Sequence, residues 1–350
     1  MSDRVTDAVW GAIAGHTLGS TQIGSRPFKR LAFYEPGPLR MPPSPAFDAW
    51  LVFARFLSTG EGPEALWRDS LEAWQYATEA SAIGRANSAR GVPVPLSGRL
   101  GNPYRSAANA LARTVFWGLV FPGRPEAAAD WAFWDASFDH ADEGVWTAVS
   151  AAASVAAAAV EGAALSDVLR AATAALPTAS QGSKVVSAVL QSMGESDPLP
   201  ALKARWEGEF PSASPTDAIL AFGSAVAGVT LAKDTASAVT GAAGFGGAAD
   251  QSASFAGTLA SLLLGRIAPE WTEPLGDAYV CGHGLRAVEP PTSLAEFAAT
   301  VAAALPHAKT AGSWRPSEDA DVAALSRDVR LEGRFPGAPI EHGSDGWQVA

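Results

Sequence analysis

Four polar residues at expected helix starts are the first candidates for chemistry in this sequence. Asp48 lies in PAFDAWLVFARFL, Asp139 and His140 lie in ASFDHADEGVW, and Asp250 lies in GGAADQSAS. Carboxylates and an imidazole can act as general acid, general base or nucleophile on a glycosidic bond. A single carboxylate at a helix start more often caps the helix or faces its dipole. A catalytic role for these residues therefore depends on how the helices bring them together.

Other familiar catalytic patterns are absent from the sequence. The five histidines show no HxxxH or HExxH spacing, there is no GxSxG motif, and no glycine-rich loop ends in Lys-Ser. The one cysteine, Cys281, excludes an internal disulfide and a cysteine-based zinc site. We assign this thiol no catalytic role, which leaves the carboxylates and histidines as candidates.

Composition restricts the partners that we expect. The 350 residues are 48% hydrophobic and carry a net charge of −11, so the overall field repels nucleic acid. The alanine-rich stretch 147–159 is shorter than the ~20 residues that span a bilayer. The N-terminal sequence lacks the pattern of a secretory signal. We expect no nucleic-acid partner, no membrane partner and a cytoplasmic location.

Helices are the elements that must position these residues. Alanine- and leucine-rich segments with apolar residues three and four apart recur along the chain. They cover 70–80, 124–141, 142–162, 164–176, 184–193 and 216–232. We therefore predict an all-α fold with one domain over residues 1–310. Residues 311–350 have no helical period and are expected to form a C-terminal extension with little regular structure, packed on the same domain.

Small residues and tryptophans form a second pattern. Gly11, Gly15 and Gly19 place glycines along one face of an N-terminal helix, which favours close packing against another helix or, alternatively, against a ligand. The chain also has 12 tryptophans, of which most are expected in the core. Trp50 and Trp146 are our candidates for lining a pocket.

Several of these segments, taken in order, resemble one family. They are the helix GAIAGHTLG, the loop GNPYR, the run FPGRPEAAADWAFWDASFDHADEG, the helix start GGAAD and the later RIAPEW. As a set they are similar to the ADP-ribosylglycohydrolase superfamily, which includes dinitrogenase reductase-activating glycohydrolases and ADP-ribosyl-acceptor hydrolases. The similarity covers about residues 8–275 and implies a single all-α, orthogonal multi-helix domain.

The resemblance also implies a magnesium site that this sequence alters. Family members hold two magnesium ions between an early Thr-Asp-Asp-Thr-type motif and a late Gly-Gly-Asp-Thr-Asp-type motif. Here the late motif ends in Ala248, Ala249 and Asp250, and the early segment SPAFDAW has Asp48 as its one acid. Magnesium needs several oxygen ligands. We therefore expect no cofactor and no resident metal, or at most one weakly bound magnesium ion at Asp48 and Asp250.

Three interpretations follow from the altered motifs. The first is a pseudoenzyme that binds a ribosyl or nucleotide-like small molecule, or a protein partner. The second is a metal-independent enzyme that uses Asp48 and Asp250, or Asp139 and His140. The third is a pocket reshaped by tryptophans for a less polar or cationic molecule. The expected ligand-contacting residues are Asn102, Tyr104, Arg105, Arg113, His16, Trp50 and Trp146.

Overall fold

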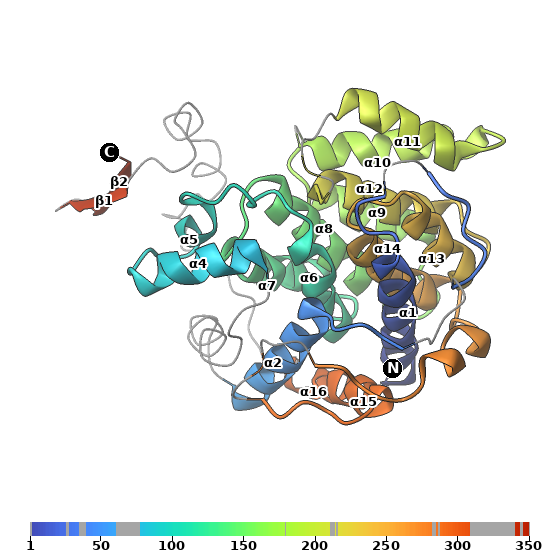
Figure 1. Cartoon of the computed structure of the whole chain (residues 1–350), viewed down its shortest axis with the longest axis horizontal. Helices are drawn as coiled ribbons and strands as arrows, with labels where there is room; N and C mark the ends of the chain where they lie inside the picture. The colour runs from blue at the N-terminus through green and yellow to red at the C-terminus, as the bar shows by residue number, and fades with distance from the viewer. Residues whose placement is uncertain are drawn as a thin grey trace.

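The computed structural model confirms the all-α prediction for the main body of the chain (Figure 1). It describes residues 2–25, 28–34, 40–60, 78–178, 180–210, 214, 216–281, 285, 288–308, 340–343 and 346–349. The predicted helix over 70–80 lies mostly outside these residues. None of the described helices is both long and apolar enough to cross a membrane.

The described helices follow the chain in this order: α1 (Ser2–Ser20), α2 (Pro45–Thr59), α4 (Glu79–Ala89), α5 (Leu96–Arg99), α6 (Asn109–Val120), α7 (Pro125–Ser137), α8 (Glu143–Ala158), α9 (Leu165–Ala174), α10 (Gln181–Gln191), η1 (Ser192–Gly194), α11 (Pro198–Glu209), α12 (Ala218–Thr230), α13 (Thr235–Gly244), α14 (Ala249–Leu263), η2 (Pro269–Trp271), η3 (Glu273–Leu275), α15 (Leu294–Ala303) and α16 (Leu305–Ala308).

Helices α1 and α14 pack against each other in opposite directions through the glycine stripe (Figure 1). Gly11 faces the carbonyl of Gly257, and Gly19 faces the carbonyl of Ala249. A Cβ atom at Gly15 would lie 2.0 Å from the carbonyl oxygen of Ala253, so no side chain fits there. The stripe therefore serves close helix packing, and it sets the start of α14 beside the end of α1.

Aromatic side chains fill the core between α2, α6 and α7. The ring centroids of Phe53 and Trp117 are 4.9 Å apart, and those of Trp117 and Trp131 are 5.1 Å apart. Trp50 is completely buried and donates its indole N–H to the carbonyls of Ala112 and Arg113. These contacts hold α6 and α7 in the positions from which they supply the buried polar residues described below.

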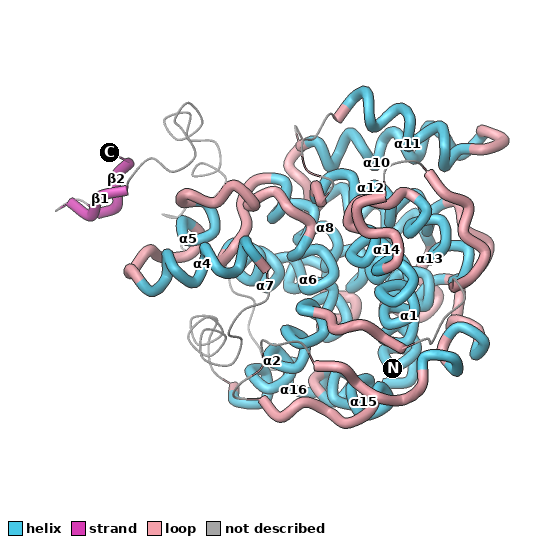
Figure 2. Tube along the Cα trace, in the orientation of Figure 1, coloured by secondary structure: helices cyan, strands magenta, loops and turns pink. Residues whose placement is uncertain are grey.

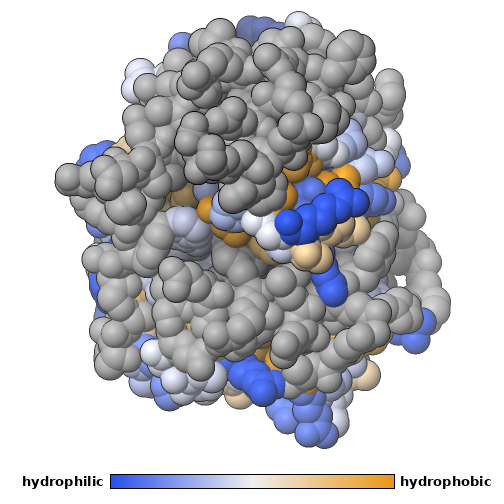
Figure 3. Space-filling model, turned by 90° about the vertical axis from the view of Figure 1, so that its left-hand side faces the viewer, coloured by the Kyte–Doolittle hydropathy of each residue, from blue (hydrophilic) through white to orange (hydrophobic). Residues whose placement is uncertain are grey.

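The surface of the domain is chemically mixed where the structure describes it. On the side shown in Figure 3, hydrophilic residues stand among smaller hydrophobic patches. Such scattered apolar exposure is ordinary for a globular protein, so this view by itself indicates no particular partner.

Two short strands near the C-terminus are the non-helical elements of the described chain (Figure 2). Strands β1 (Ile340–Gly343) and β2 (Gly346–Val349) pair antiparallel, with Ile340 opposite Val349. The hairpin is regular structure that the sequence pattern of the extension did not predict. Packing of the extension on the domain, and the boundary near residue 310, stay predictions.

Candidate functional site

A buried ionic network connects α6 with the end of α7. The guanidinium of Arg113 contacts both carboxylate oxygens of Asp139, with both nitrogen–oxygen distances 2.7 Å. Its Nε lies 2.9 Å from Oδ1 of Asp135. Asp135 in turn accepts a hydrogen bond of 3.1 Å from the indole N–H of Trp117. All these side chains are buried, so one cation lies between two carboxylates inside the protein.

The two carboxylates of this network differ in their affinity for protons. Burial raises the pKa of Asp135 to about 7, and the nearby Arg113 offsets only part of that effect. Burial also acts to raise the pKa of Asp139, but Arg113 and His140 outweigh it and hold that pKa well below its usual range. Asp139 is therefore the ionised partner of Arg113, whereas Asp135 titrates near neutral pH.

His140 extends the network toward a cavity. Its Nδ1 lies 2.6 Å from Oδ1 of Asp139. The other oxygen of Asp139, Oδ2, accepts a 2.7 Å hydrogen bond from the hydroxyl of Ser81. Within the part of the chain that the structure describes, Nε2 of His140 and Oγ of Ser137 are buried without a hydrogen-bond partner. Unsatisfied buried polar atoms of this kind are uncommon and indicate a site for water or a ligand group.

The loop that carries Asn102 supports the turn between α7 and α8, which presents His140. The amide of Asn102 donates to the carbonyls of Asp139 and Gly98, at 2.7 and 2.9 Å, and its oxygen accepts from the backbone N–H of Tyr104. Asn102 is fully buried, whereas the Tyr104 side chain is 46% exposed. Asn102 thus holds the loop against the turn that presents His140, and Tyr104 lies at the surface.

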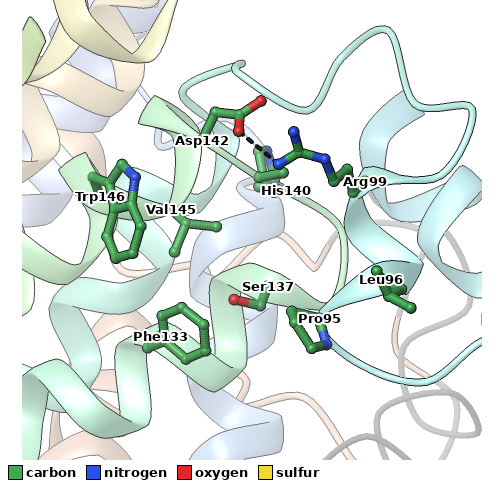
Figure 4. Close-up of a pocket in the computed structure, with 10 residues that line it drawn as sticks. Pro95, Leu96, Arg99, Phe133, Ser137, His140, Asp142, Val145 and Trp146 are labelled. Atoms are coloured by element: carbon green, nitrogen blue, oxygen red, sulfur yellow. Dashed lines mark hydrogen bonds and ion pairs between the residues drawn. The ribbon is translucent and has the colours of Figure 1, made fainter. Parts of the chain in front are cut away.

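A small cavity lies beside His140 (Figure 4). It has a volume of about 30 Å³ and is lined mainly by apolar side chains, including Phe133, Val145 and Trp146. Such a volume holds one or two water molecules, or one ligand group that enters from outside. Asp142, which lines the cavity together with Arg99, has its two carboxylate oxygens 2.9 Å from Arg99 and from Arg105. Trp146, a predicted ligand residue, and His140, a predicted catalytic residue, line this cavity, while Trp50 lies in the core.

Asp48 is turned toward the segment that follows η3. Ser44 caps α2 by accepting the backbone N–H of Phe47, so Asp48 lies in the first turn and not at the cap. Its carboxylate accepts a 2.9 Å hydrogen bond from the hydroxyl of Tyr279. Burial, with a further contribution from Asp48, raises the pKa of the Cys281 thiol to about 11. Asp48 is thus a buried acceptor for neighbouring side chains.

Asp250 lies in the first turn of α14, opposite His16. It accepts a 2.8 Å hydrogen bond from the side chain of Gln251. The imidazole of His16 is buried against Phe47, with ring centroids 5.2 Å apart. Burial lowers the pKa of His16, and Asp250 together with nearby backbone carbonyls opposes that change. His16 and Asp250 therefore form a partly buried pair between the end of α1 and the start of α14.

Two glycines fix the start of α14. Gly246 and Gly247 have φ angles of +71° and +64°, which glycine adopts without strain. Gly247 exchanges two backbone hydrogen bonds with the loop after α1, donating to Ser25 at 3.0 Å and accepting from Gly24 at 2.9 Å. The glycine pair therefore places the first turn of α14, and with it Asp250, relative to α1.

Comparison with known proteins identifies the family. The model of the ADP-ribosylglycohydrolase family matches residues 1–311. The chain belongs to the ADP-ribosylglycohydrolase family. A solved structure described as an ADP-ribosylglycohydrolase-related protein complex is 21% identical, with a TM-score of 0.61, over 88% of this chain and 98% of that one. At this identity the likeness supports the fold alone. No curated protein matches the sequence.

The carboxylates at the two helix starts are bound by protein donors. Asp48 has its carboxylate bound by Tyr279, and Asp250 has its carboxylate bound by Gln251. Ala248 and Ala249 offer no side-chain oxygen, and both are buried. Among the described residues, no group of three or more His, Cys, Asp or Glu side chains could hold a metal ion. The loss of the magnesium site stays a prediction from the altered motifs.

The structure distributes the four predicted catalytic residues over three hydrogen-bonded groups. Asp139 and His140 belong to the Arg113 network, while Asp48 and Asp250 each have their own partners. Our sequence reasoning did not single out Asp135, Tyr279, Gln251, Ser81 or Ser137. Asp135 was open to prediction, because a carboxylate four residues before Asp139 falls on the same helix side. The partnership of Tyr279 with Asp48 spans 231 residues and leaves no local signal.

Proposed function

We propose that this chain is a ligand-binding member of the ADP-ribosylglycohydrolase family that does not carry out the two-magnesium hydrolysis of ADP-ribosyl bonds. The observation that carries the proposal is the engagement of both remaining carboxylates by protein donors, Tyr279 on Asp48 and Gln251 on Asp250. In a dinuclear site such oxygens face the ions and the substrate. Here a metal ion would first have to displace hydrogen bonds that the protein already makes.

The cavity beside His140 is the proposed place for part of the ligand. The unpartnered Nε2 of His140 and Oγ of Ser137 lie next to an apolar wall that includes Phe133 and Trp146. One or two hydrogen-bonding atoms of a ligand, entering beside a flat apolar wall, are complementary to that combination. Because the family acts on ADP-ribosyl substrates, we propose a ribosyl or nucleotide-like small molecule. The metal-independent enzyme stays a prediction, with no observation that favours it.

Magnesium binding tests the loss of the metal site. We expect isothermal titration calorimetry to detect no magnesium binding tighter than millimolar, with or without ADP-ribose. We also expect no release of ADP-ribose from an ADP-ribosyl-arginine substrate. Restoring oxygens in the double variant Ala248→Asp, Ala249→Thr provides a reference, since any gain in affinity there shows that the assay can report a repaired site. Two magnesium ions per wild-type chain together with hydrolysis would refute the proposal.

Ligand titrations test the second part of the proposal, the binding of a ribosyl or nucleotide-like molecule beside His140. Thermal-shift and calorimetric titration with ADP-ribose, adenosine and ribose 5-phosphate should find at least one ligand. That affinity should fall about tenfold or more in Trp146→Ala, because this half-buried indole lines the cavity. Trp134→Ala is the matched control, since Trp134 is equally half-buried on α7 but lies outside the cavity lining. Equal losses in both variants, or no binding of any of the three compounds, would contradict a nucleotide-like ligand here.

A further inference from the structure

A second and larger cavity lies between α11, α12 and the glycine turn that precedes α14. Its volume is about 390 Å³, and it shares no lining residue with the cavity beside His140. This volume falls in the range of small-molecule sites. Helices α11 and α12 lie close together at the upper right of Figure 1, away from α4 and α5. Occupation of this cavity is thus independent of the function proposed above.

The wall formed by α11 combines a cation with aromatic rings. The ammonium of Lys203 has a side chain only 14% exposed and lies 3.5 Å from a carboxylate oxygen of Glu207. At that distance the Lys203 ammonium can still bind a second anion. Trp206 stacks on Phe245 with ring centroids 5.2 Å apart, and Phe210 completes the apolar wall. A partly desolvated ammonium beside aromatic faces favours an anion that has a flat apolar body.

The opposite wall is backbone at the start of a long helix. Gly246, Gly247 and Ala248 line the cavity immediately before α14, and no side chain caps this helix. The first N–H groups of an uncapped helix carry partial positive charge and attract anionic groups. The Asp250 carboxylate, in the same turn, is engaged by Gln251.

Trp206 contributes a buried indole to the wall of the cavity. Trp206 is 1% exposed and lines the cavity, and its indole Nε1 has no acceptor among the described residues. Buried indole N–H groups usually have a partner, which can be a group absent from the protein itself.

We propose that this cavity binds a small organic anion, an aromatic body that carries a carboxylate or phosphate group. The anionic group lies between Lys203 and the start of α14, and the ring lies against Phe210 and Phe245. A neutral molecule of the same shape would gain the aromatic contacts but lose the electrostatic ones. The site therefore discriminates by charge.

Two anionic probes and one neutral probe test the proposal. Indole-3-acetate and phenyl phosphate present the two acid groups, and indole-3-acetamide is the neutral isostere of the first. We expect at least one anion to bind with a dissociation constant of about 1 mM or tighter. Indole-3-acetamide should bind at least about tenfold more weakly than indole-3-acetate. Which anion binds more tightly decides between carboxylate and phosphate. The proposal would be overturned if neither anion binds, or if indole-3-acetate and indole-3-acetamide bind with equal affinity.

Matched variants locate the binding. Lys203→Met should weaken anion binding about tenfold or more, whereas Lys184→Met, on the exposed face of α10, should leave it unchanged. Leu220→Trp fills the cavity and should abolish binding, while Ile219→Trp, an equally half-buried neighbour outside the lining, should not. Binding that persists in Leu220→Trp would place the anion elsewhere and refute this site.

A spectroscopic readout reports on the cavity directly. The indole N–H resonance of Trp206, assigned by its disappearance in Trp206→Phe, should shift when the anion is added to the ¹⁵N-labelled full chain. An unshifted resonance under saturating anion would count against the site even if binding occurs. None of these variants changes a residue that lines the cavity beside His140, so failure here leaves the ADP-ribose experiments informative.

Discussion

Asp135 should make the protein less stable as the pH rises from 4 to 7. Its carboxyl has a pKa of about 7 in the folded chain because burial penalises the charge more than Arg113 and Trp117 stabilise it. In the unfolded chain the value returns to about 3.8. At a pH between these two pKa values, the folded state keeps a proton on Asp135 that the unfolded state has released. Stability from this group is therefore complete below pH 4 and is lost as the pH approaches 7.

The size of the effect follows from the shift. A pKa raised by about 3 units corresponds to on the order of 4 kcal/mol, or ~1.4 kcal/mol for each pH unit crossed. Asp139 has the opposite sign, because its pKa is lowered in the folded state. Its contribution is present above pH 4 and disappears at more acidic pH, so the two carboxylates act in different pH windows.

The variant Asp135→Asn separates this effect from the rest of the protein. Urea denaturation at pH 5.0, 6.0, 7.0 and 8.0 should give a free energy of unfolding that falls less steeply in the variant than in the wild type. The cost of the substitution should therefore shrink with rising pH. Asp167→Asn, at an exposed carboxylate on α9, should keep the wild-type slope. Parallel curves for wild type and Asp135→Asn would refute the view that Asp135 is the protonated member of the Arg113 network.

Three further substitutions test other parts of the structure. Gly15→Ala should lower the free energy of unfolding, measured by urea denaturation, by about 3 kcal/mol or more, because its Cβ would lie 2.0 Å from a backbone carbonyl of α14. The control Gly208→Ala lies in open space on α11 and should cost nothing. Similar values for both variants would contradict the packing argument. Tyr279→Phe should lower stability by about 1–3 kcal/mol by removing a donor from buried Asp48; an unchanged midpoint would exclude this bond as a stabilising one. Asp48→Asn should lower the thiol pKa of Cys281 and speed its alkylation by iodoacetamide about tenfold at pH 8, and mass spectrometry checks the rate.

Local patterns predicted the fold and the packing of its closest helix pair. Apolar recurrence at three and four residues produces amphipathic helices, and alanine-rich segments favour them intrinsically, so the all-α architecture follows from short-range physics. The glycines at 11, 15 and 19 could be assigned to one face for the same reason. Their partner helix could not be named, because close approach depends on the backbone of α14, more than 200 residues further along the chain.

The roles of the polar residues were beyond the reach of local patterns. Asp139 and Arg113 are candidates for ligand contact by type, yet each satisfies the other inside the protein. Asp48 is a candidate ligand for magnesium by type, but Tyr279 approaches it from a segment that carries no helical period. A carboxylate acts on a substrate or a metal only when the fold leaves it without an internal donor. That condition depends on long-range contacts, which sequence spacing does not encode.

The same condition gives the turn before α14 a role that needs no side-chain oxygens. The glycine pair holds the helix start against the loop after α1, and Ala248 and Ala249 beside it carry no side-chain oxygen. An uncapped helix start of this kind attracts anions through its backbone alone. Loss of carboxylates at such a position lowers affinity for cations and raises it for anions. On our proposal, a helix start that begins with two alanines can thus form the wall of an anion-binding cavity.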